Sequence, residues 1–590
     1  MPLESTDDRR TAGPLKHLQR VSFDAPVDLA LDGRLPAVTV GYETWGELNA
    51  DHSNAVLVCH AISGDSHCAR HPEDPDDDPG WWDELIGPGR FIDTDQFFVI
   101  CPNILGGCRG TTGPGSVNPA TGEPYGPDFP PLTVEDMVDL HVRLLDHLGI
   151  QRLRAVVGGS LGGHQSLVLA TRYPERVKTC VAVATSPRLT SQALAFDVVA
   201  RNAIQRDPHY HGGHYYDKPT QPSTGLAIAR MLGHITYLSS EAMDAKFDPD
   251  RHKPRDLETA FESRFSVGSY LAHQGEKFVE RFDANSYIAI SMAMDLYDLG
   301  RTHGDRMATL GRAACDFLVV SFSSDWLFTP AQSRDIVQAL TEQSLPVTYC
   351  EITSHAGHDA FLLPDEISRF GPVIAAKLDR RDHAPIRQRP EDELILDLIT
   401  EGSSVLDLGC GDGDLLAMLR EREQRLGHAP ARLCGVEVSQ DRIIATARRG
   451  LDVIDYDLNV GLPGFETRSF DYVVLSATLQ TLEDVEMVIG EMVRVGHKAI
   501  VSFPNFAHRD LRDSFVREGK SPKAPGDYEH EWYNTPNRRF PTVADFDDFL
   551  AAKGYRNEVA VYLDSQTRRR VPDDDDPNLN ADTAVYVISA

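Results

Sequence analysis

A serine flanked by glycines, Gly158-Gly-Ser160-Leu-Gly162, places the strongest constraint on how this chain can fold. It directly follows the apolar run 153–157 and precedes a helix-forming stretch, residues 163–172. That order predicts a strand, a sharp turn and a helix, and the glycines two residues before and after the serine leave room for a strained elbow. In such an elbow the hydroxyl stands above the sheet edge, where the following backbone N–H groups can face a developing oxyanion. We interpret Ser160 as a nucleophile, with a purely structural turn as the alternative.

Length, charge and cysteine content limit the class of protein. At 590 residues the chain is too long for one hydrophobic core, so several domains are expected. A formal net charge of −31 argues against nucleic-acid partners, which require a basic face. The sequence has neither an apolar run long enough to span a membrane nor an apolar signal at its start, so no membrane partner is expected. The nine scattered cysteines fit neither a disulfide framework nor a zinc site, which favours a cytoplasmic protein without a metal.

Two acidic runs stand out, at residues 73–78 and 573–576. Both lie among prolines, which is typical of solvated loops. A high-salt habitat, in which self-repulsion is screened, is the alternative explanation of the charge.

The pattern of strands and helices divides the chain into two α/β domains. Buried strands alternate with helices over residues 1–380, which indicates a parallel sheet with helical crossovers. This rhythm stops at about residues 186–309, a helical segment without a convincing buried strand, which we predict to be a lid over the active site. Residues 381–390 are polar and contain proline, as linkers do. A second α/β pattern fills residues 391–590.

A serine nucleophile needs a base to take its proton and a carboxylate to orient that base. Asp325 ends one predicted strand, and His358 lies on the loop after the next, in the chain order of the α/β-hydrolase fold. His355 is the competing base. Asp316 is the competing acid, but it precedes its strand and would lie at the wrong end of the sheet. Position favours Ser160, Asp325 and His358 as the catalytic residues, and the choice of His358 over His355 rests also on the family resemblance described below.

The oxyanion hole is expected to combine two backbone N–H groups. One belongs to Leu161, directly after the nucleophile, and the other to Ile62, in the loop that follows the predicted strand 55–59. His60 begins this loop, either as a structural anchor or as a participant in the chemistry.

Seven stretches of the first domain resemble the MetX family, the homoserine O-acyltransferases of methionine biosynthesis, within the α/β-hydrolase superfamily. They occur in order at residues 41–46, 60–65, 103–114, 158–165, 229–237, 324–328 and 357–362.

The resemblance implies a reaction and a set of substrate contacts. An acyl-CoA would acylate Ser160, and the homoserine hydroxyl would then accept the acyl group, with His358 as the base in both steps. Arg230 would bind the homoserine carboxylate, for which a guanidinium fork is suited, and Asp359 would bind the ammonium group. The acyl-CoA is a co-substrate, so no cofactor is implied for this domain. Members of the family are typically homodimers that pair through their lid helices.

Residue 327 bears on the identity of the acyl donor. Succinyl carries a carboxylate, and family members that use succinyl-CoA have a basic residue at this position, whereas this chain has Leu327. An apolar residue favours acetyl-CoA, and the predicted product is O-acetyl-L-homoserine. Succinyl transfer, or a serine esterase of the same fold, is the alternative.

The second domain begins with another glycine-rich turn between a strand and a helix. Asp407 is followed by Gly409, Gly411 and Gly413, a spacing that resembles the S-adenosylmethionine site of class I methyltransferases. A dinucleotide site is the alternative for a turn of this kind. The resemblance implies a Rossmann-like fold.

Two acids complete the implied S-adenosylmethionine site, Glu437 at the ribose and Asp457 at the adenine. Residues 384–590 as a whole resemble MetW, a methyltransferase-like protein associated with this acyltransferase, with support from residues 502–505 and 531–537. Catalysis of methyl transfer does not follow from the resemblance. Ligand sensing, or support of the acyltransferase, is the alternative.

Overall fold

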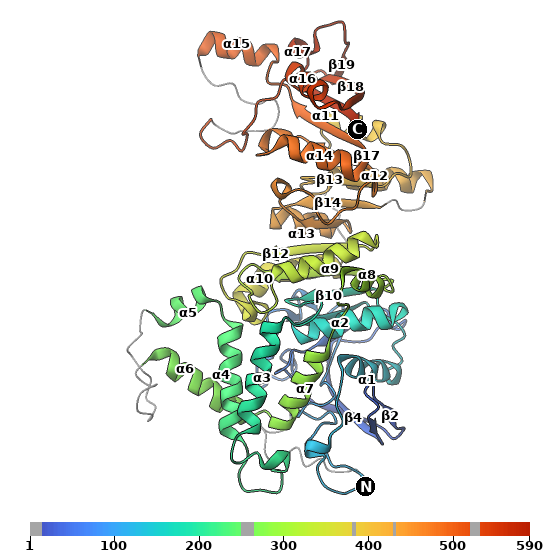
Figure 1. Ribbon diagram of the computed structural model, residues 1–590. Coiled ribbons are helices and arrows are strands. Elements are labelled where there is room, and N and C mark those ends of the chain that lie inside the picture. The colour runs from blue at the N-terminus through green and yellow to red at the C-terminus, as the bar shows by residue number, and fades with distance from the viewer. Residues whose placement is uncertain (1–14, 249–264, 380–384, 429–431, 520–531) are drawn as a thin grey trace. The chain divides into compact units, whose positions relative to one another are not determined.

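The computed structural model describes residues 15–248, 265–379, 385–428, 432–519 and 532–590 (Figure 1). The chain divides into two compact units, of which the first consists mainly of the residues up to Leu378 and the second mainly of Asp379–Ala590. Residues 381–384 of the predicted linker lie outside the described residues, as does Glu531 of the stretch 531–537.

The first unit is built on a sheet whose spatial order differs from chain order. In spatial order its strands are β1 (Gln19–Phe23), β4 (Val38–Trp45), β8 (Phe98–Pro102), β5 (Ala55–Cys59), β9 (Ala155–Gly159), β10 (Thr179–Val183), β11 (Asp316–Phe322) and β12 (Val347–Ile352). β1 and β8 run antiparallel to β4, whereas the pairs from β8 to β11 are parallel. Every residue of β5, β9 and β10 is buried, as expected for the central strands of a parallel sheet. Two short ribbons accompany the sheet, β2 (Val27–Asp28) with β3 (Arg34–Leu35) and β6 (Ile86–Gly87) with β7 (Ile92–Asp93).

Helices pack against this sheet and bury its apolar residues. They are α1 (Val134–His147), α2 (Leu161–Arg172), α9 (Pro330–Glu342) and α10 (Pro364–Leu378). α2 contacts β5, β9 and β10, α9 contacts β11, and α10 contacts β10 and β11. α1 begins at a capping box in which Thr133 and Asp136 satisfy each other's backbone N–H groups. These features confirm the predicted α/β-hydrolase fold.

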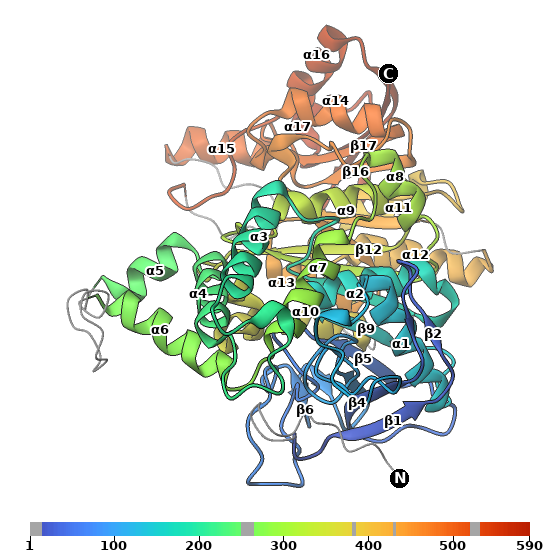
Figure 2. The same cartoon turned by 60° about the horizontal axis from the view of Figure 1, so that its bottom comes forward.

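A group of helices fills the segment that the sequence predicts to be a lid (Figures 1 and 2). They are α3 (Ser191–Gln205), α4 (Ser223–Tyr237), α5 (Ser240–Phe247), α6 (Ser266–Val279), α7 (Ala284–Leu296) and α8 (His303–Leu310). α4 packs between α3 and α6, and α3 also contacts α7. Within the described part of 186–309, a single bridge between Arg188 and Asp298 is the only β pairing. The helical character predicted for this segment is confirmed.

The second unit has a sheet with a reversal of strand order at its centre. Its strands lie in the order β15 (Asp452–Asp455), β14 (Leu433–Glu437), β13 (Val405–Leu408), β16 (Phe470–Ser476), β17 (Gly496–Pro504), β20 (Thr583–Ser589), β18 (Arg556–Asp564) and β19 (Arg569–Val571). The first five are parallel and follow the order 3-2-1-4-5 of a doubly wound Rossmann-like sheet, as predicted. β20 inserts antiparallel between β17 and β18. The switch in strand order lies at β13, where such sheets bind their ligands.

The helices of the second unit join and cover these strands. They are α11 (Pro390–Leu398), α12 (Asp414–Leu426), α13 (Gln440–Arg448), α14 (Val485–Val495), α15 (Arg509–Glu518), α16 (Val543–Lys553) and α17 (Pro577–Asn580). Across the described parts of both units, no helix combines the length and hydropathy that a bilayer crossing requires.

Candidate active site

Ser160 occupies the strained elbow that the glycine pattern predicts. It follows β9 and directly precedes α2, with φ 58° and ψ −122°, a conformation that a residue with a side chain rarely adopts. The glycines on either side are required by close backbone packing: a Cβ on Gly158 would lie 2.1 Å from the carbonyl oxygen of Gly162, and one on Gly162 would lie 2.0 Å from that of Cys59. The predicted turn is confirmed.

The side chains of Ser160, Asp325 and His358 meet in one hydrogen-bonded row. His358 Nε2 lies 2.9 Å from Ser160 Oγ, and His358 Nδ1 lies 2.8 Å from Asp325 Oδ2. The other carboxylate oxygen of Asp325 accepts from the backbone N–H groups of Leu327 and Phe328, at 3.0 and 2.9 Å. Asp325 is therefore fixed in place and can fix the imidazole in turn.

The surroundings of His358 suit a proton acceptor. Burial opposes the charged imidazole, but the neighbouring Asp325 outweighs it, so the pKa of His358 is raised above its ordinary value. Tyr237, Phe328 and Phe361 surround the ring, with centroids 5.1–5.9 Å away. His358 and Ser160 are only 2% and 6% exposed, so the site restricts access of water.

The competing acid and base lie elsewhere. Asp316 is the first residue of β11, at the opposite end of that strand from Asp325. His355 is exposed, and its carbonyl oxygen accepts from the Ser239 hydroxyl. Neither has a hydrogen bond to Ser160 in the structure.

The two predicted oxyanion donors belong to different elements of the fold. Leu161 is the first residue of α2, where backbone N–H groups have no partner within the helix, and Ile62 lies in the loop after β5. His60 anchors this loop: its Nδ1 lies 2.8 Å from the Ala61 carbonyl oxygen, and its Nε2 accepts from the Ile104 N–H at 3.2 Å. The structure thus gives His60 the anchoring role of the two that the sequence left open.

The residues predicted to bind homoserine lie beside this row. Arg230, on α4, donates from Nη1 to Ser63 Oγ at 3.1 Å and has no carboxylate within 4 Å among the described residues. Asp359 follows His358, and within the described chain its carboxylate has no hydrogen-bond donor. Burial raises the pKa of Asp359 above its ordinary value, although Arg230 acts in the opposite direction. A charged group of each sign is thus available to a ligand.

A small cavity lies between helices α3, α4 and α7 and the loop after β5, which contains Ile62 and is called the oxyanion loop after the predicted role of that residue. Its volume is about 30 Å³. Side chains of the lid, the oxyanion loop and the segment after β11 line it, and most are apolar: Ile62, Leu189, Ala193, Phe196, Ala200, Ala229, Leu232, Tyr237, Tyr287, Met294, Leu327 and Phe328. Asp197 is the one ionisable side chain besides the tyrosines among its lining residues. Burial and the adjacent Asp295 carboxyl raise the pKa of Asp197 well above its ordinary value, which favours a neutral wall.

A buried glutamate holds the continuation of the oxyanion loop. Glu43, on β4, is fully buried and accepts from Ser66 Oγ at 2.8 Å, with the rings of His67 and His71 at 2.9 and 3.1 Å. The other nitrogen of His67 lies 2.8 Å from the Asp78 carbonyl oxygen. Since both nitrogens of His67 face acceptors, both must carry hydrogen and the ring is cationic.

The pKa values agree with this assignment. Burial would raise the pKa of Glu43, but its hydrogen bonds with the two histidines and Ser66 lower it to about 2. Burial would lower the pKa of His67, but its bonds with Glu43 and the Asp78 carbonyl raise it to about 9. A buried ion pair therefore ties the loop to the sheet.

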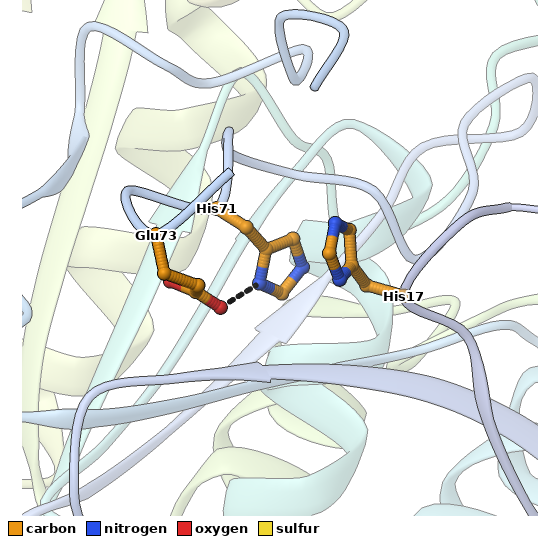
Figure 3. A group of neighbouring side chains, drawn as sticks. All are labelled: His17, His71 and Glu73. Atoms are coloured by element: carbon orange, nitrogen blue, oxygen red, sulfur yellow. Dashed lines mark ion pairs between the residues drawn. The ribbon is translucent and has the colours of Figure 1, made fainter. Parts of the chain in front are cut away.

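Figure 3 shows a further histidine in the same region. His17 stacks on His71, with ring centroids 4.0 Å apart and planes inclined by 30°, and Glu73 Oε1 lies 3.4 Å from His71 Nδ1. The lone pair of an imidazole nitrogen lies in the plane of its ring. Two stacked rings therefore do not direct their lone pairs at one ion, and the arrangement suits packing and charge pairing better than metal coordination.

In the second unit, the predicted glycine turn connects β13 to α12. Gly409, Gly411 and Gly413 all have positive φ, at 70°, 58° and 76°. Asp407 is 3% exposed, burial raises its pKa to about 7, and no hydrogen bond reaches its carboxyl group from the described residues. A Cβ on Gly411 would meet nothing within 4 Å. A buried acid without a partner beside an open glycine turn fits a ligand with a positively charged group.

The carboxylates of the other two residues predicted to contact the ligand, Glu437 and Asp457, accept hydrogen bonds from neighbouring backbone N–H groups. Glu437 accepts from the N–H groups of Gly411, Val438 and Ser439 at 2.9–3.0 Å. Asp457 accepts from the N–H and side-chain amide of Asn459, both at 2.9 Å. Glu437 thus lies against the glycine turn, and Asp457 caps a short helical turn.

Sequence reasoning missed residues whose roles arise only in the folded chain. Ser63, Tyr237 and Arg281 lie around the candidate site, and the sequence carries no signal for them beyond the matching stretches that contain two of them. Glu43 could have been noticed, because it is an acid within a strand of mostly buried residues.

Comparisons with known proteins agree with both units. A profile described as "alpha/beta hydrolase fold" matches residues 54–365, and one described as "Methionine biosynthesis protein MetW" matches residues 389–588. The homoserine O-succinyltransferase of Aromatoleum aromaticum is 52% identical over 61% of this chain and 96% of its own length. Two solved structures cover 61% of the chain: the homoserine O-acetyltransferase from Bacillus anthracis (30% identity, TM-score 0.55, 97% of that chain) and esterase E22 (29%, 0.56, 100%).

The fold and the row of serine, histidine and aspartate define the first unit as a member of the α/β-hydrolase superfamily. A relative in Rhodopirellula baltica, the bifunctional methionine biosynthesis protein MetXA/MetW, is 60% identical over 99% of this chain and 95% of its own length. The chain therefore belongs to the bifunctional MetXA/MetW family, which confirms both resemblances predicted from the sequence.

The Glu43–His67 pair predicts a pH dependence of stability. The folded chain binds the His67 proton more tightly than the unfolded chain, whose histidines titrate near pH ~6.5. The stabilisation is therefore complete below that pH and is lost as the pH rises through about 9. In thermal unfolding over this window, we expect His67→Gln to have a lower melting temperature at neutral pH and a flatter decline. His147→Gln, at an exposed histidine of α1, is the control. An unchanged decline in His67→Gln would contradict the prediction.

Proposed function

We propose that the first unit transfers an acyl group from an acyl-CoA to the hydroxyl of L-homoserine through an acyl-serine intermediate. The observation that carries the proposal is the row from Ser160 Oγ to His358 Nε2 and from His358 Nδ1 to Asp325, beside unpaired charges of both signs. The names of the homoserine O-acyltransferases similar to this chain support the choice of acceptor.

The geometry supports the following steps. His358 Nε2 takes the proton of Ser160 as Oγ attacks the thioester carbonyl, and the Leu161 and Ile62 N–H groups stabilise the oxyanion. The tetrahedral intermediate collapses, and the CoA thiolate leaves with the proton from His358. The homoserine hydroxyl then gives its proton to His358 and attacks the acyl group, after which Ser160 leaves and recovers the proton. Asp325 orients the imidazole throughout.

The acceptor is selected by charge. Arg230 binds the homoserine carboxylate and Asp359 binds its ammonium group. Because Asp359 is adjacent to His358 in the chain, an acceptor held by its amino-acid end can direct its hydroxyl toward the base. A simple esterase has no need for either charge, which favours transfer over hydrolysis.

We propose acetyl-CoA as the donor. The cavity beside Leu327 is lined mostly by apolar side chains, and none of the side chains lining it is a cation. The carboxylate of a succinyl group would lose water there without gaining a partner, which is costly. Succinyl-CoA is the second candidate, because relatives about half identical to this chain are named succinyltransferases.

The family resemblance also leads us to propose a homodimer formed through the lid. Exposed apolar side chains on α3, α4 and α7 provide a surface for it: Val198, Val199, Ile228, Ile235, Met292 and Leu296.

For the second unit we propose an S-adenosylmethionine site at the carboxyl end of β13. Asp407 would accept from the ligand's ammonium group, the glycine turn would allow its close approach, and Glu437 and Asp457 would face the ribose and adenine. When bound, the ligand supplies an activated methyl group. The same site is compatible with ligand sensing and with support of the acyltransferase, as well as with methyl transfer.

A direct rate comparison tests the reaction and the donor. With saturating homoserine, we expect kcat/KM for acetyl-CoA to exceed that for succinyl-CoA by at least about tenfold, the cost of leaving a carboxylate unpaired. Product analysis should show O-acetylhomoserine. A preference for succinyl-CoA would refute the proposed donor, whereas free acid without acylated homoserine would indicate an esterase.

Arg230→Lys tests the acceptor site. A point charge loses the bidentate geometry of guanidinium, so KM for homoserine should rise on the order of tenfold, with the rate of acyl-enzyme formation nearly unchanged. Stopped-flow acylation and steady-state kinetics separate the two effects. An unchanged KM for homoserine would show that Arg230 does not bind the homoserine carboxylate.

Isothermal titration calorimetry with S-adenosylmethionine tests the second unit. We expect the wild-type chain to bind it and Asp407→Asn to bind at least about tenfold more weakly, since an amide cannot balance an ammonium charge. Asp471→Asn, at an exposed acid of β16 that bonds Ser404, is the control. If the wild-type chain gives no heat of binding, the proposed S-adenosylmethionine site is refuted and a scaffolding role remains for the second unit.

A further inference from the structure

A second lid arginine, Arg281, lies at the candidate active site and has no role in the reaction steps described above. It follows α6 and lies three positions before Ala284, the first residue of α7. The intervening Asp283 caps α7 and also accepts hydrogen bonds from the hydroxyls of Tyr215 and Tyr216, at 2.6 and 3.0 Å. The backbone that carries Arg281 is therefore held on two sides.

The two lid arginines meet the oxyanion loop at the same residue. Arg281 Nη1 donates to the carbonyl oxygen of Ser63 at 2.9 Å, and Arg230 Nη1 donates to Ser63 Oγ at 3.1 Å. Both guanidinium groups lie near the Phe278 ring, with Cζ 5.4 and 5.0 Å from its centroid. Ser63 directly follows Ile62, the proposed oxyanion donor.

The charge of Arg281 is poorly compensated. Among the described residues no carboxylate lies within 4 Å of it, and the acid that acts on it most, Asp65, lies 3.6 Å from Arg109. Burial lowers the pKa of Arg281, and the adjacent Arg230 lowers it further. Burying a guanidinium without a nearby carboxylate costs free energy of folding. One hydrogen bond to a carbonyl oxygen does not by itself explain why the fold contains such a group.

We infer that Arg281 is a positioning residue that holds the Ser63 carbonyl, and through it the Ile62 N–H, in the oxyanion hole. The lid thereby completes the acylation site in addition to covering it. The inference rests on the proposed acyl-serine chemistry. A charge-assisted hydrogen bond to the carbonyl fixes the loop, and the positive charge also favours the oxyanion.

Acylation by p-nitrophenyl acetate is the sharpest test, because its burst of p-nitrophenol reports on the oxyanion hole without acyl-CoA or homoserine. For Arg281→Met we expect the acylation rate to fall on the order of 100-fold, as for other small misplacements of catalytic groups. KM for homoserine should stay within about twofold, in contrast to Arg230→Lys. Arg281→Lys should recover most of the rate, since an ammonium group can still donate to the Ser63 carbonyl.

Arg206→Met is the matched control, because Arg206 is an exposed lid arginine that bonds Asn202. Its acylation rate should equal that of the wild type. Melting temperatures are measured for every variant, and Arg281→Gln, which keeps one donor, replaces Arg281→Met if the latter does not fold.

Three results would overturn the inference. An unchanged burst rate in Arg281→Met would show that Arg281 does not position the oxyanion hole. A higher KM for homoserine with normal acylation would make Arg281 a second carboxylate ligand. Equal losses of rate and melting temperature in the Met and Lys variants would indicate a structural role only.

If the wild type shows a burst but does not transfer an acyl group to homoserine, the proposed function fails while this test still stands.

Discussion

The backbone strain at Ser160 is the constraint on which the rest of the first unit depends. A serine at φ 58° is tolerated because β9 and α2 hold it from both sides. These two elements can approach only because Gly158 has no Cβ, and α2 can approach β5 only because Gly162 has none. The same turn places Leu161 at the start of α2 and Ser160 Oγ within reach of His358. One local conformation thus positions the proposed nucleophile and one proposed oxyanion donor against the proposed base.

In the proposed account, the helices of the predicted lid determine which reaction Ser160 can carry out. The chain shares its fold with both an esterase and an acyltransferase, so the fold does not by itself separate hydrolysis from transfer. The distinguishing groups are on or against the lid: Arg230 and Arg281 face Ser63, and the cavity wall beside Leu327 is apolar. In the proposed account, charge selects an amino-acid acceptor and burial disfavours water.

Local sequence patterns sufficed to predict part of this site. The elbow, the strand ends carrying Asp325 and the loop carrying His358 follow from short-range rules of turns and strand order. By contrast, the bond from Arg281 to Ser63 joins residues more than two hundred positions apart, and no periodicity or motif encodes such a contact. The cation at His67 is equally invisible in sequence, because it depends on two acceptors from different segments. In the second unit, glycine spacing predicted the turn, whereas the backbone bonds of Glu437 depend on its exact rotamer.

Mass spectrometry of the acyl-enzyme tests the central claim most directly. On mixing with acetyl-CoA, the account predicts one acetyl group on the peptide that contains Ser160, no acetylation of Ser160→Ala, and loss of the label with formation of O-acetylhomoserine once homoserine is added. An acetyl group that persists on another residue, or O-acetylhomoserine formed at the wild-type rate by Ser160→Ala, would contradict it.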